Sequence, residues 1–424
     1  MTSVEDRTTI DFNDPRTFDD PWETYAWLRS LDTLHYDEKN DLYVTGKHAD
    51  VFFMSREADT YCSRFGVRPV IAGDMSLITL DGDEHTRQRR LINQGFTPRR
   101  VRELIPHVRA LTDEVLDEIS EKGHVDFVED FAIHVPLIII CEMLGLDPDQ
   151  RMRMYRWSDA MMDGDGHADS DSPQLQLAAE CFGEYATMCV DLIERRRQDP
   201  SDDLISVLTQ AFDRGDLEGK QTAYQGLTDE QIAEREADRL DDDELLGFLT
   251  ILLVAGNETT RNAITGGLHA LSQFPEQKQL LLDNLHDDDF MDKAVDELVR
   301  YVSPVIGFIR TVTVDHNYEG TDLEEGDRVL MLYGSANRDA TVFDDPDVLD
   351  LTRDPNPHLA FGIGPHFCLG ANLARMEVKV VFQQLLDRLP DIHVPDGVFP
   401  ERGDSSLVLA LQEMPAEFTG CPVH

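Results

Sequence analysis

The sequence predicts a mainly α-helical protein with a minor β region, folded as a single large domain over residues 1–424. Two observations favour this class. Apolar residues recur at helical spacing over long stretches, as in VRALTDEVLDEISEKG and PLIIICEMLGL, whereas runs with strand-like alternation are few and short. In addition, the sequence contains no repeat, no low-complexity tract and no linker that would divide it into separate domains.

The first elements predict a small β-rich part near the N-terminus. A helix is expected over WETYAWLRSL, followed by a strand pair in LHYDEKNDLYVTG, where two alternating runs flank a turn of Glu38, Lys39, Asn40 and Asp41. From Asp83 to about Arg214 the spacing is helical, and the helical part of the domain is expected to extend over about 83–390.

The second half of the chain predicts a long central helix. The polar segment 212–240 is interpreted as a surface excursion, because it has few large apolar residues. After it, ELLGFLTILLVAGNETTRNAITGGLHALSQF is apolar nearly all round, as expected of a helix that crosses the centre of a large domain. Short strands are expected around HNYEG and GDRVLMLYGSANRD, and a helix over ANLARMEVKVVFQQLLDRL.

Charge and cysteine content exclude several functions. With 83 acidic and 38 basic residues, the formal charge of -45 argues against binding to nucleic acid or to anionic lipid, and a solvated acidic surface explains it. The six cysteines form no CxxC pair, which argues against a zinc site or a disulfide framework and fits a reducing cytoplasm. The sequence shows neither a signal peptide nor an apolar run of about 18 residues, so we expect a cytoplasmic protein without a membrane anchor.

The strongest chemical signal is the decapeptide FGIGPHFCLG, which delivers Cys368 directly before a helix. Glycines let the backbone pass close to a flat macrocycle, and the free N–H groups of a helix N-terminus stabilise a thiolate. Such a thiolate can bind haem iron and favour O–O cleavage. The alternative is that Cys368 is a buried small hydrophobic residue, the usual fate of a single cysteine in a helical protein.

The pattern FxxGxxxCxG over Phe361–Gly370 matches the haem-binding signature of the cytochrome P450 superfamily, and the resemblance covers roughly residues 20–410. The resemblance implies the cytochrome P450 fold and a haem b cofactor (iron protoporphyrin IX) with Cys368 as the proximal ligand of the iron. It also implies that Phe361, Gly362 and Gly370 contact the cofactor.

The segment AGNETT interrupts the long apolar helix with an acid and two hydroxyls, and buried polar groups of this kind cost free energy unless they are paired or used. By resemblance, Ala255 lies against the haem, Thr259 hydrogen-bonds the bound dioxygen, and Glu258 helps to relay protons. A threonine that bonds back to the preceding turn of a core helix is the alternative.

The residues Glu297 and Arg300 stand three apart, hence on one helical face. An exposed ion pair is the default interpretation of this spacing. Because the pair falls between the long helix and the cysteine loop, it resembles the ExxR pair of the family. The resemblance implies a structural role, in which both residues bond to the chain that precedes the haem loop.

Four residues are candidates to bind the haem propionates, which need cationic or hydrogen-bonding partners. His85 and Arg89 lie four apart in HTRQRRLINQGFTPRR, and by resemblance both reach the propionates. Arg310 in PVIGFIRTV and His366 in the cysteine loop complete the set. Ordinary surface cations are the alternative.

A basic island interrupts the acidic sequence, and it predicts the surface at which electrons enter. The resemblance implies that electrons come from a small acidic ferredoxin or a flavoprotein, and a ferredoxin with an NAD(P)H-dependent ferredoxin reductase is the leading expectation. The donor is expected to be a separate protein, because the chain has no flavin or iron–sulfur motif. A positive patch would steer an acidic partner. The island consists of Arg87, Arg89, Arg90, Arg99, Arg100 and Arg102, and it could extend to Arg375 and Lys379.

Similarity of the segments 63–69, DMSLITLDGDEH, NQGFTPRRV and PNPHLAFGIGPHFCLG to actinobacterial steroid side-chain and fatty-chain hydroxylases favours an apolar substrate such as a steroid, a terpenoid or a fatty acid. Steroid side-chain hydroxylation is the leading expectation. Plain core packing is the alternative for each apolar residue expected to line the pocket. These candidates are Met75, Leu77, Leu252, Ala255, Val305 and Ile306.

The leading function is therefore that of a monooxygenase, which inserts one oxygen atom of O2 into a C–H bond with two electrons from outside. A peroxide-driven peroxygenase is a second hypothesis, and the acid–alcohol pair Glu258 and Thr259 argues against it. A haem sensor or ligand carrier is a third. A sensor would bind ligand but form no product when redox partners are supplied, and it would not need proton-delivery residues.

Overall fold

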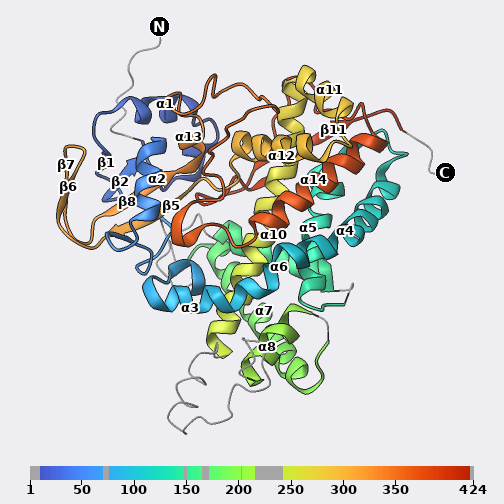
Figure 1. The fold of residues 1–424 in the computed structure, drawn as a ribbon, viewed down its shortest axis with the longest axis horizontal. Coiled ribbons are helices and arrows are strands. Elements are labelled where there is room, and N and C mark those ends of the chain that lie inside the picture. Colours follow the sequence, from blue (N-terminus) through green and yellow to red (C-terminus); the bar gives the residue numbers. More distant parts are fainter. Residues whose placement is uncertain are drawn as a thin grey trace.

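The computed structural model describes residues 10–69, 76–147, 150–164, 171–201, 203–214 and 242–420, and helices dominate it (Figure 1). The mainly α class with a minor β region is confirmed. Met75 and most of the polar segment 212–240 lie outside the described residues.

The helices lie close to where hydrophobic periodicity placed them. Helix predictions at WETYAWLRSL, at the long apolar segment and at ANLARMEVKVVFQQLLDRL are confirmed as α1, α10 and α14. The bounds are α1 (Trp22–Ser30), α2 (His48–Arg56), α3 (Gly82–Ile92), α4 (Pro98–Ile119), α5 (His134–Met143), α6 (Arg151–Gly164), α7 (Pro173–Gln198), α8 (Leu204–Arg214), α10 (Asp242–Gln273), α11 (Pro275–Asp283), α12 (Asp288–Val302), α13 (Tyr333–Ala336) and α14 (Ala371–Arg388).

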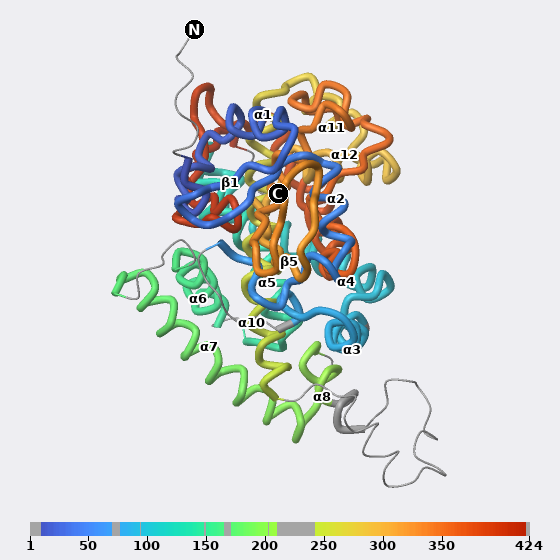
Figure 2. Tube along the Cα trace, turned by 90° about the vertical axis from the view of Figure 1, so that its left-hand side faces the viewer, coloured from blue at the N-terminus to red at the C-terminus, as the bar shows by residue number. Residues whose placement is uncertain are grey.

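Helix α10 passes through the middle of the molecule, as Figure 2 shows, and packs against α5, α6, α7, α12 and α14. Its apolar side chains are buried on several faces, which explains why the sequence here shows no polar stripe. Its polar residues Asn257, Glu258, Thr260, Arg261 and Asn262 are buried as well, and they must find partners inside the protein.

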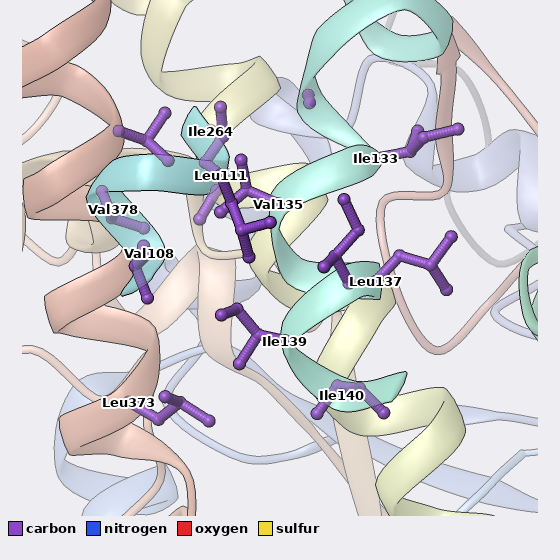
Figure 3. Close-up of a cluster of buried hydrophobic side chains, with 14 of the residues drawn as sticks. Val108, Leu111, Ile133, Val135, Leu137, Ile139, Ile140, Ile264, Leu373 and Val378 are labelled. Atoms are coloured by element: carbon purple, nitrogen blue, oxygen red, sulfur yellow. The ribbon is translucent and has the colours of Figure 1, made fainter. Parts of the chain in front are cut away.

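The main core lies where α4, α5, α10 and α14 meet (Figure 3). The run Val135–Cys141 of α5 is buried throughout, because neighbouring helices surround α5. Truncation of a buried leucine or isoleucine in such a core typically costs about 2–5 kcal/mol. This core fixes α10 relative to α14, the two helices that carry the polar segment AGNETT and the chain after Cys368.

The largest sheet has the strand order β1-β2-β8-β5-β3. The predicted strand pair is confirmed, since β1 (His35–Asp37) and β2 (Leu42–Thr45) are antiparallel. The β region is not confined to the N-terminus, however, because β2 pairs in parallel with β8 (Arg328–Leu332). A two-stranded hairpin is marginal alone, and the distant strands β5 (Gly307–Val312) and β8 complete it together with β3 (Tyr61–Cys62).

Three smaller strand pairs lie outside this sheet, so the part predicted as helical, 83–390, also contains strands. The pairs are β4 (His124–Asp126) with β11 (Pro415–Glu417), β6 (His316–Tyr318) with β7 (Thr321–Leu323), and β9 (Glu401–Arg402) with β10 (Leu411–Glu413). Within the described ranges, no helix has the length and apolar character needed to cross a membrane.

Candidate active site

The chain around Cys368 forms a tight loop between a short 3-10 turn, Gly364–His366, and α14. The backbone N–H of Cys368 donates to the carbonyl of Phe361 over 2.8 Å, which closes the loop. Gly364 has a φ of +78°, and a Cβ there would lie 2.5 Å from the carbonyl oxygen of Ser55. Glycine is therefore required at this position for the loop to pack against α2.

Opposing effects act on the Cys368 sulfur. Burial raises the pKa of the thiol, whereas the N–H of Gly370 and the charges of Arg89 and Arg375 lower it. The balance is a raised pKa, so the helix N-terminus alone does not outweigh burial. A bound metal cation changes this balance, because coordination deprotonates a thiol outright.

One cavity brings together all nine residues that the sequence predicted to bind the cofactor. Its remaining walls are mostly apolar and come mainly from α10, α14, the strand β5 with the chain before it, and the segments 77–78 and 407–408. The nine residues are His85, Arg89, Ala255, Arg310, Phe361, Gly362, His366, Cys368 and Gly370.

The polar groups in this cavity fit a macrocycle with anionic arms. The Nε2 atom of His85 is buried and has no hydrogen-bond partner in the part of the chain that the structure describes. Burial, with the neighbouring charges of His366 and Arg89, lowers the pKa of His85 to about 4, so this imidazole is a neutral hydrogen-bonding group at pH 7. Arg310 is a buried cation whose pKa is lowered by burial. A buried cation and an unsatisfied imidazole are what a propionate would satisfy.

Arg89 and His366 also have partners within the protein. Arg89 donates to the carbonyl of Phe367, the residue before Cys368. His366 lies 3.6 Å from the carboxylate of Asp81, and its ring centroid lies 4.3 Å from that of His85. Burial lowers the pKa of His366 although the bond to Asp81 opposes the shift. The two histidines therefore form a tilted, mainly neutral ring pair at one side of the cavity.

Thr259 lines the cavity from α10, and its hydroxyl donates to the carbonyl of Ala255 over 2.7 Å. This is the back-bonding arrangement that was the alternative for a threonine in a core helix. The hydroxyl also remains accessible from the cavity, and its oxygen can accept a further hydrogen bond.

Glu258 does not line the cavity but faces α6. Its carboxylate forms an ion pair with Arg261 at 2.5 Å and accepts from Ser158 at 3.3 Å. Burial raises the pKa of Glu258, and the charge of Arg261 opposes the shift. The structure therefore brings only Thr259 of the expected acid–alcohol pair to the cavity, because adjacent helical residues project about 100° apart and Arg261 holds Glu258 on the α6 side.

Glu377 is a cavity residue that the sequence analysis missed. It is 1% exposed and lines the cavity from α14. Burial raises the pKa of its carboxyl to about 8, and a hydrogen bond with Thr260 of α10 opposes this. The signal in the sequence was a glutamate between Met376 and Val378, on a helix whose neighbouring positions are apolar. A buried titratable group beside the cavity is a candidate functional group.

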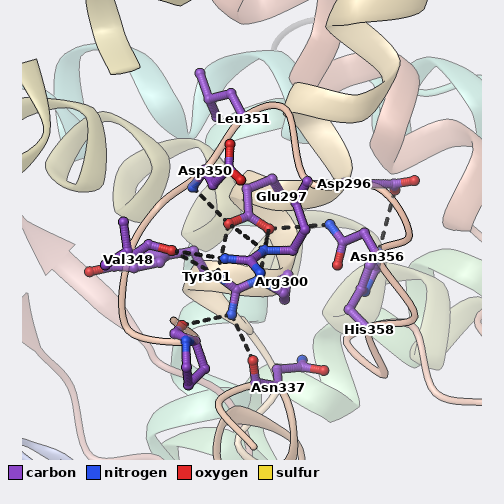
Figure 4. A network of polar contacts seen from close by, with 12 residues as sticks. Asp296, Glu297, Arg300, Tyr301, Asn337, Val348, Asp350, Leu351, Asn356 and His358 are labelled. Carbon is purple, nitrogen blue, oxygen red and sulfur yellow. Dashed lines mark hydrogen bonds and ion pairs between the residues drawn. The ribbon is translucent and has the colours of Figure 1, made fainter. Parts of the chain in front are cut away.

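The pair Glu297 and Arg300 is fully buried and ties α12 to the chain before the haem loop (Figure 4). Two nitrogens of Arg300 donate to Glu297 over 2.7 and 2.8 Å, and the guanidinium also binds the carbonyl of Asn337 at 2.7 Å. Glu297 accepts further bonds from the backbone of Asp350 at 2.9 Å and from Asn356 at 3.2 Å. The geometry fits a structural role.

The residues expected to line a substrate pocket divide into three groups. Leu77, Leu252 and Val305 line the cavity, and Met75 lies outside the described residues. Ile306 instead packs in the core beneath the sheet, because successive residues of an extended chain point to opposite sides. Further apolar lining residues that the sequence did not single out include Phe96, Phe248, Phe308 and Leu407.

The proposed extensions of the basic island are neutralised in the structure. Arg375 pairs with Asp296, and Lys379 pairs with Asp288 and Asp292, all on α12. Arg102 is exposed, and exposed Arg99 pairs with Glu103 on the same helix. The exposed members of the island are thus Arg90 on α3 and Arg99 and Arg102 on α4.

The fold and the site together define a haem-thiolate oxidoreductase. The family model described as "Cytochrome P450" matches residues 58–419, and the chain belongs to the cytochrome P450 family. Among curated proteins it is 33% identical over 398 residues to a "Steroid C26-monooxygenase" of Mycolicibacterium smegmatis, covering 94% of this chain and 92% of that protein. It is 34% identical to a protein of that name from Mycobacterium tuberculosis, with 94% of both chains covered.

Known structures give the same family. A cytochrome P450 of Mycobacterium marinum in complex with pseudoionone superposes with a TM-score of 0.82 and 32% identity, covering 97% of this chain and 98% of that one. A Bacillus megaterium relative in complex with testosterone gives a TM-score of 0.80 at 29% identity, covering 94% and 97% of the two chains. This protein is thus a monooxygenase that uses O2 and an organic substrate.

Haem-thiolate iron, when bound, supplies the activation of O2. The residues of this chain would bind the cofactor and exclude water from the space beside it. Cys368 would offer the sulfur ligand, Arg310 and His85 would offer partners for the cofactor's carboxylates, and the mostly apolar walls would keep water from the space next to Thr259. Water exclusion strengthens electrostatic interactions in the site and suppresses side reactions.

Proposed function

We propose that this monooxygenase binds haem b and hydroxylates the aliphatic side chain of a steroid, with electrons from a separate ferredoxin and its NAD(P)H-dependent reductase. The observation that carries the proposal is the apolar cavity that opens between Thr259 and the cysteine loop.

The walls of this cavity support a steroid better than a polar substrate. Side chains from four separated segments, among them Leu77, Leu252, Val305 and Leu407, present carbon atoms to the space. Transfer of apolar surface from water to such walls contributes about 25 cal/mol per Å². The curated relatives are named for monooxygenation of a steroid at C26, which in steroid numbering is a side-chain carbon. By analogy, the aliphatic tail is the part of the substrate that would approach the reacting centre.

For electron entry, the exposed start of α4 supports an acidic partner. Arg99 and Arg102 are exposed there, and Arg89 binds the backbone next to Cys368. In a chain of formal charge -45, a local basic surface directs an acidic ferredoxin to that face and away from the rest. Charge reversal of Arg102 to glutamate should slow electron transfer most at low ionic strength, since salt screens the attraction.

Equilibrium binding tests the substrate class directly. Purified holoenzyme is titrated with cholestenone, which has a side chain, with testosterone, which has none, and with a hexadecenoic acid, while the spin-state shift of the Soret band is followed. We expect the tightest binding for cholestenone, and hydroxylation of its side chain when a ferredoxin, its reductase and NADPH are supplied. Tighter binding and turnover of the fatty acid, or product at the ring system only, would contradict the proposal.

A matched pair of variants ties the result to this cavity. Val305→Trp fills the space beside the cysteine loop, whereas Val314→Trp adds the same bulk at a position that is 53% exposed. The first variant should weaken cholestenone binding at least tenfold, and the second should leave it unchanged.

A further inference from the structure

A charged pair from two helices holds Phe361, the first residue of the cysteine loop. The guanidinium of Arg375 on α14 lies over the Phe361 ring, with its carbon 4.4 Å from the ring centroid. The Nε atom of Arg375 donates to Asp296 of α12 over 2.6 Å. A cation over an aromatic face is attracted by the ring quadrupole, so Arg375 binds the ring and the carboxylate together.

His358 completes the group from the chain before the loop. Its Nδ1 accepts from the N–H of Ala360, so in the neutral imidazole Nε2 carries the hydrogen and points at Asp296, 3.5 Å away. The His358 and Phe361 ring centroids are 5.8 Å apart. Figure 4 shows Asp296 and His358 joined beside Glu297, so α12 uses neighbouring acids for two different tasks.

This group is connected to the iron ligand through a short path. Phe361 lines the cavity, and its carbonyl accepts the hydrogen bond of the Cys368 N–H over 2.8 Å. Arg375 is seven residues after Cys368 and is the fifth residue of α14, just over one turn into the helix. The charge of Arg375 acts on the Cys368 sulfur, and the ion pair with Asp296 fixes its position.

We propose that Arg375 and Asp296 are positioning residues that set the reduction potential of the bound haem in opposite directions. Reduction adds one electron from an external one-electron donor, without making or breaking a bond, and leaves the site more negative. The cation of Arg375 stabilises the reduced state, and the anion of Asp296 opposes it. The inference rests on the haem-thiolate site and is independent of the proposed steroid substrate.

Exposure of the pair makes the experiment practicable. The side chains of Arg375 and Asp296 are 33% and 34% exposed, so neutral variants of similar shape should fold and retain haem. The holoenzymes of Arg375→Gln, Asp296→Asn and the double variant are titrated with dithionite under spectroscopic control, without substrate. We expect the midpoint potential to fall in Arg375→Gln, to rise in Asp296→Asn and to return towards that of the natural protein in the double variant. The expected change is three- to tenfold in the reduction equilibrium, where tenfold is about 59 mV.

The same two helices supply a matched control. Lys379 and Asp292 stand one turn further from the cysteine loop on α14 and α12, and they form an ion pair of 2.8 Å. Lys379→Gln and Asp292→Asn should change the midpoint less than twofold in equilibrium. Shifts of the same sign in Arg375→Gln and Asp296→Asn would indicate loosening of Phe361 alone and would overturn the proposal, as would shifts equal to those of the control pair. A failure of cholestenone binding would leave these shifts unchanged.

Discussion

Replacement of Glu297 by glutamine should destabilise the folded protein strongly. Glu297 and Arg300 are both 0% exposed, and the variant leaves the Arg300 guanidinium buried without a counter-ion. Removal of one partner from a buried ion pair costs about 3–5 kcal/mol. Glutamine can still accept a hydrogen bond from Arg300 with its one oxygen. Its NH2 group, however, would face the N–H donors of Arg353 and Asn356, which in the natural protein donate to the second carboxylate oxygen of Glu297.

The loss should also reach the haem loop. Glu297 and Arg300 bind the chain at Asn337, Asp350 and Asn356, which leads into the cysteine loop. Urea unfolding of the holoenzyme should therefore shift to lower urea in both the far-ultraviolet circular dichroism and the Soret band, with haem released at the lower concentration. A loss of secondary structure without earlier haem release would separate this network from the loop.

Glu103→Gln is the matched control for this prediction. The ion pair of Glu103 with Arg99 also lies within one helix, four residues apart, but its side chains are 59% and 84% exposed. Exposed pairs contribute at most about 1 kcal/mol. If Glu297→Gln unfolded at the same urea concentration as Glu103→Gln, the structural role of the buried network would be refuted.

Two further predictions concern groups at the cavity. Glu377→Gln should stabilise the protein at pH 7 by about 3 kcal/mol, because the pKa of the Glu377 carboxyl is raised to about 8 in the folded protein. A carboxyl of this kind favours folding fully only below about pH 4.5, and this contribution is lost as the pH rises to 8. Thermal unfolding of the variant and the natural protein should therefore agree near about pH 4.5, and a difference that does not change with pH would contradict the prediction. Thr259→Ala should still consume NADPH while product falls and peroxide rises, and full coupling in this variant would rule out the role of Thr259.

Local patterns in the sequence predicted much of the fold. The helices α1, α10 and α14 and the hairpin β1-β2 could be predicted because each depends on hydrophobic spacing or turn chemistry within one segment. The sheet could not, since β2 in the first part of the chain pairs with the distant strand β8, and neither strand shows in its sequence which partner it takes. Ile306 illustrates a finer limit: the side of an extended chain that faces a cavity is set by distant packing.

Some residues of the candidate site could likewise be predicted from a local pattern, and others could not. The decapeptide around Cys368 identified its residues because loop, ligand and helix start are contiguous in sequence. The sequence around Glu258 and Glu377, in contrast, does not show whether either side chain faces the cavity. Arg261 turns Glu258 towards α6, and the packing of α14 on α10 brings Glu377 into the cavity beside Thr260. The pairing of Arg375 with Asp296 is also a contact between distant segments.

The most direct test of the account is the absorption spectrum of the dithionite-reduced protein with carbon monoxide. We expect a Soret band at the long-wavelength position that a thiolate ligand imposes, and loss of this band in Cys368→Ala. Cys141→Ala, at a buried cysteine on α5, should keep the band. A spectrum typical of histidine ligation in the natural protein, or an unchanged band in Cys368→Ala, would contradict the assignment of Cys368 as the iron ligand.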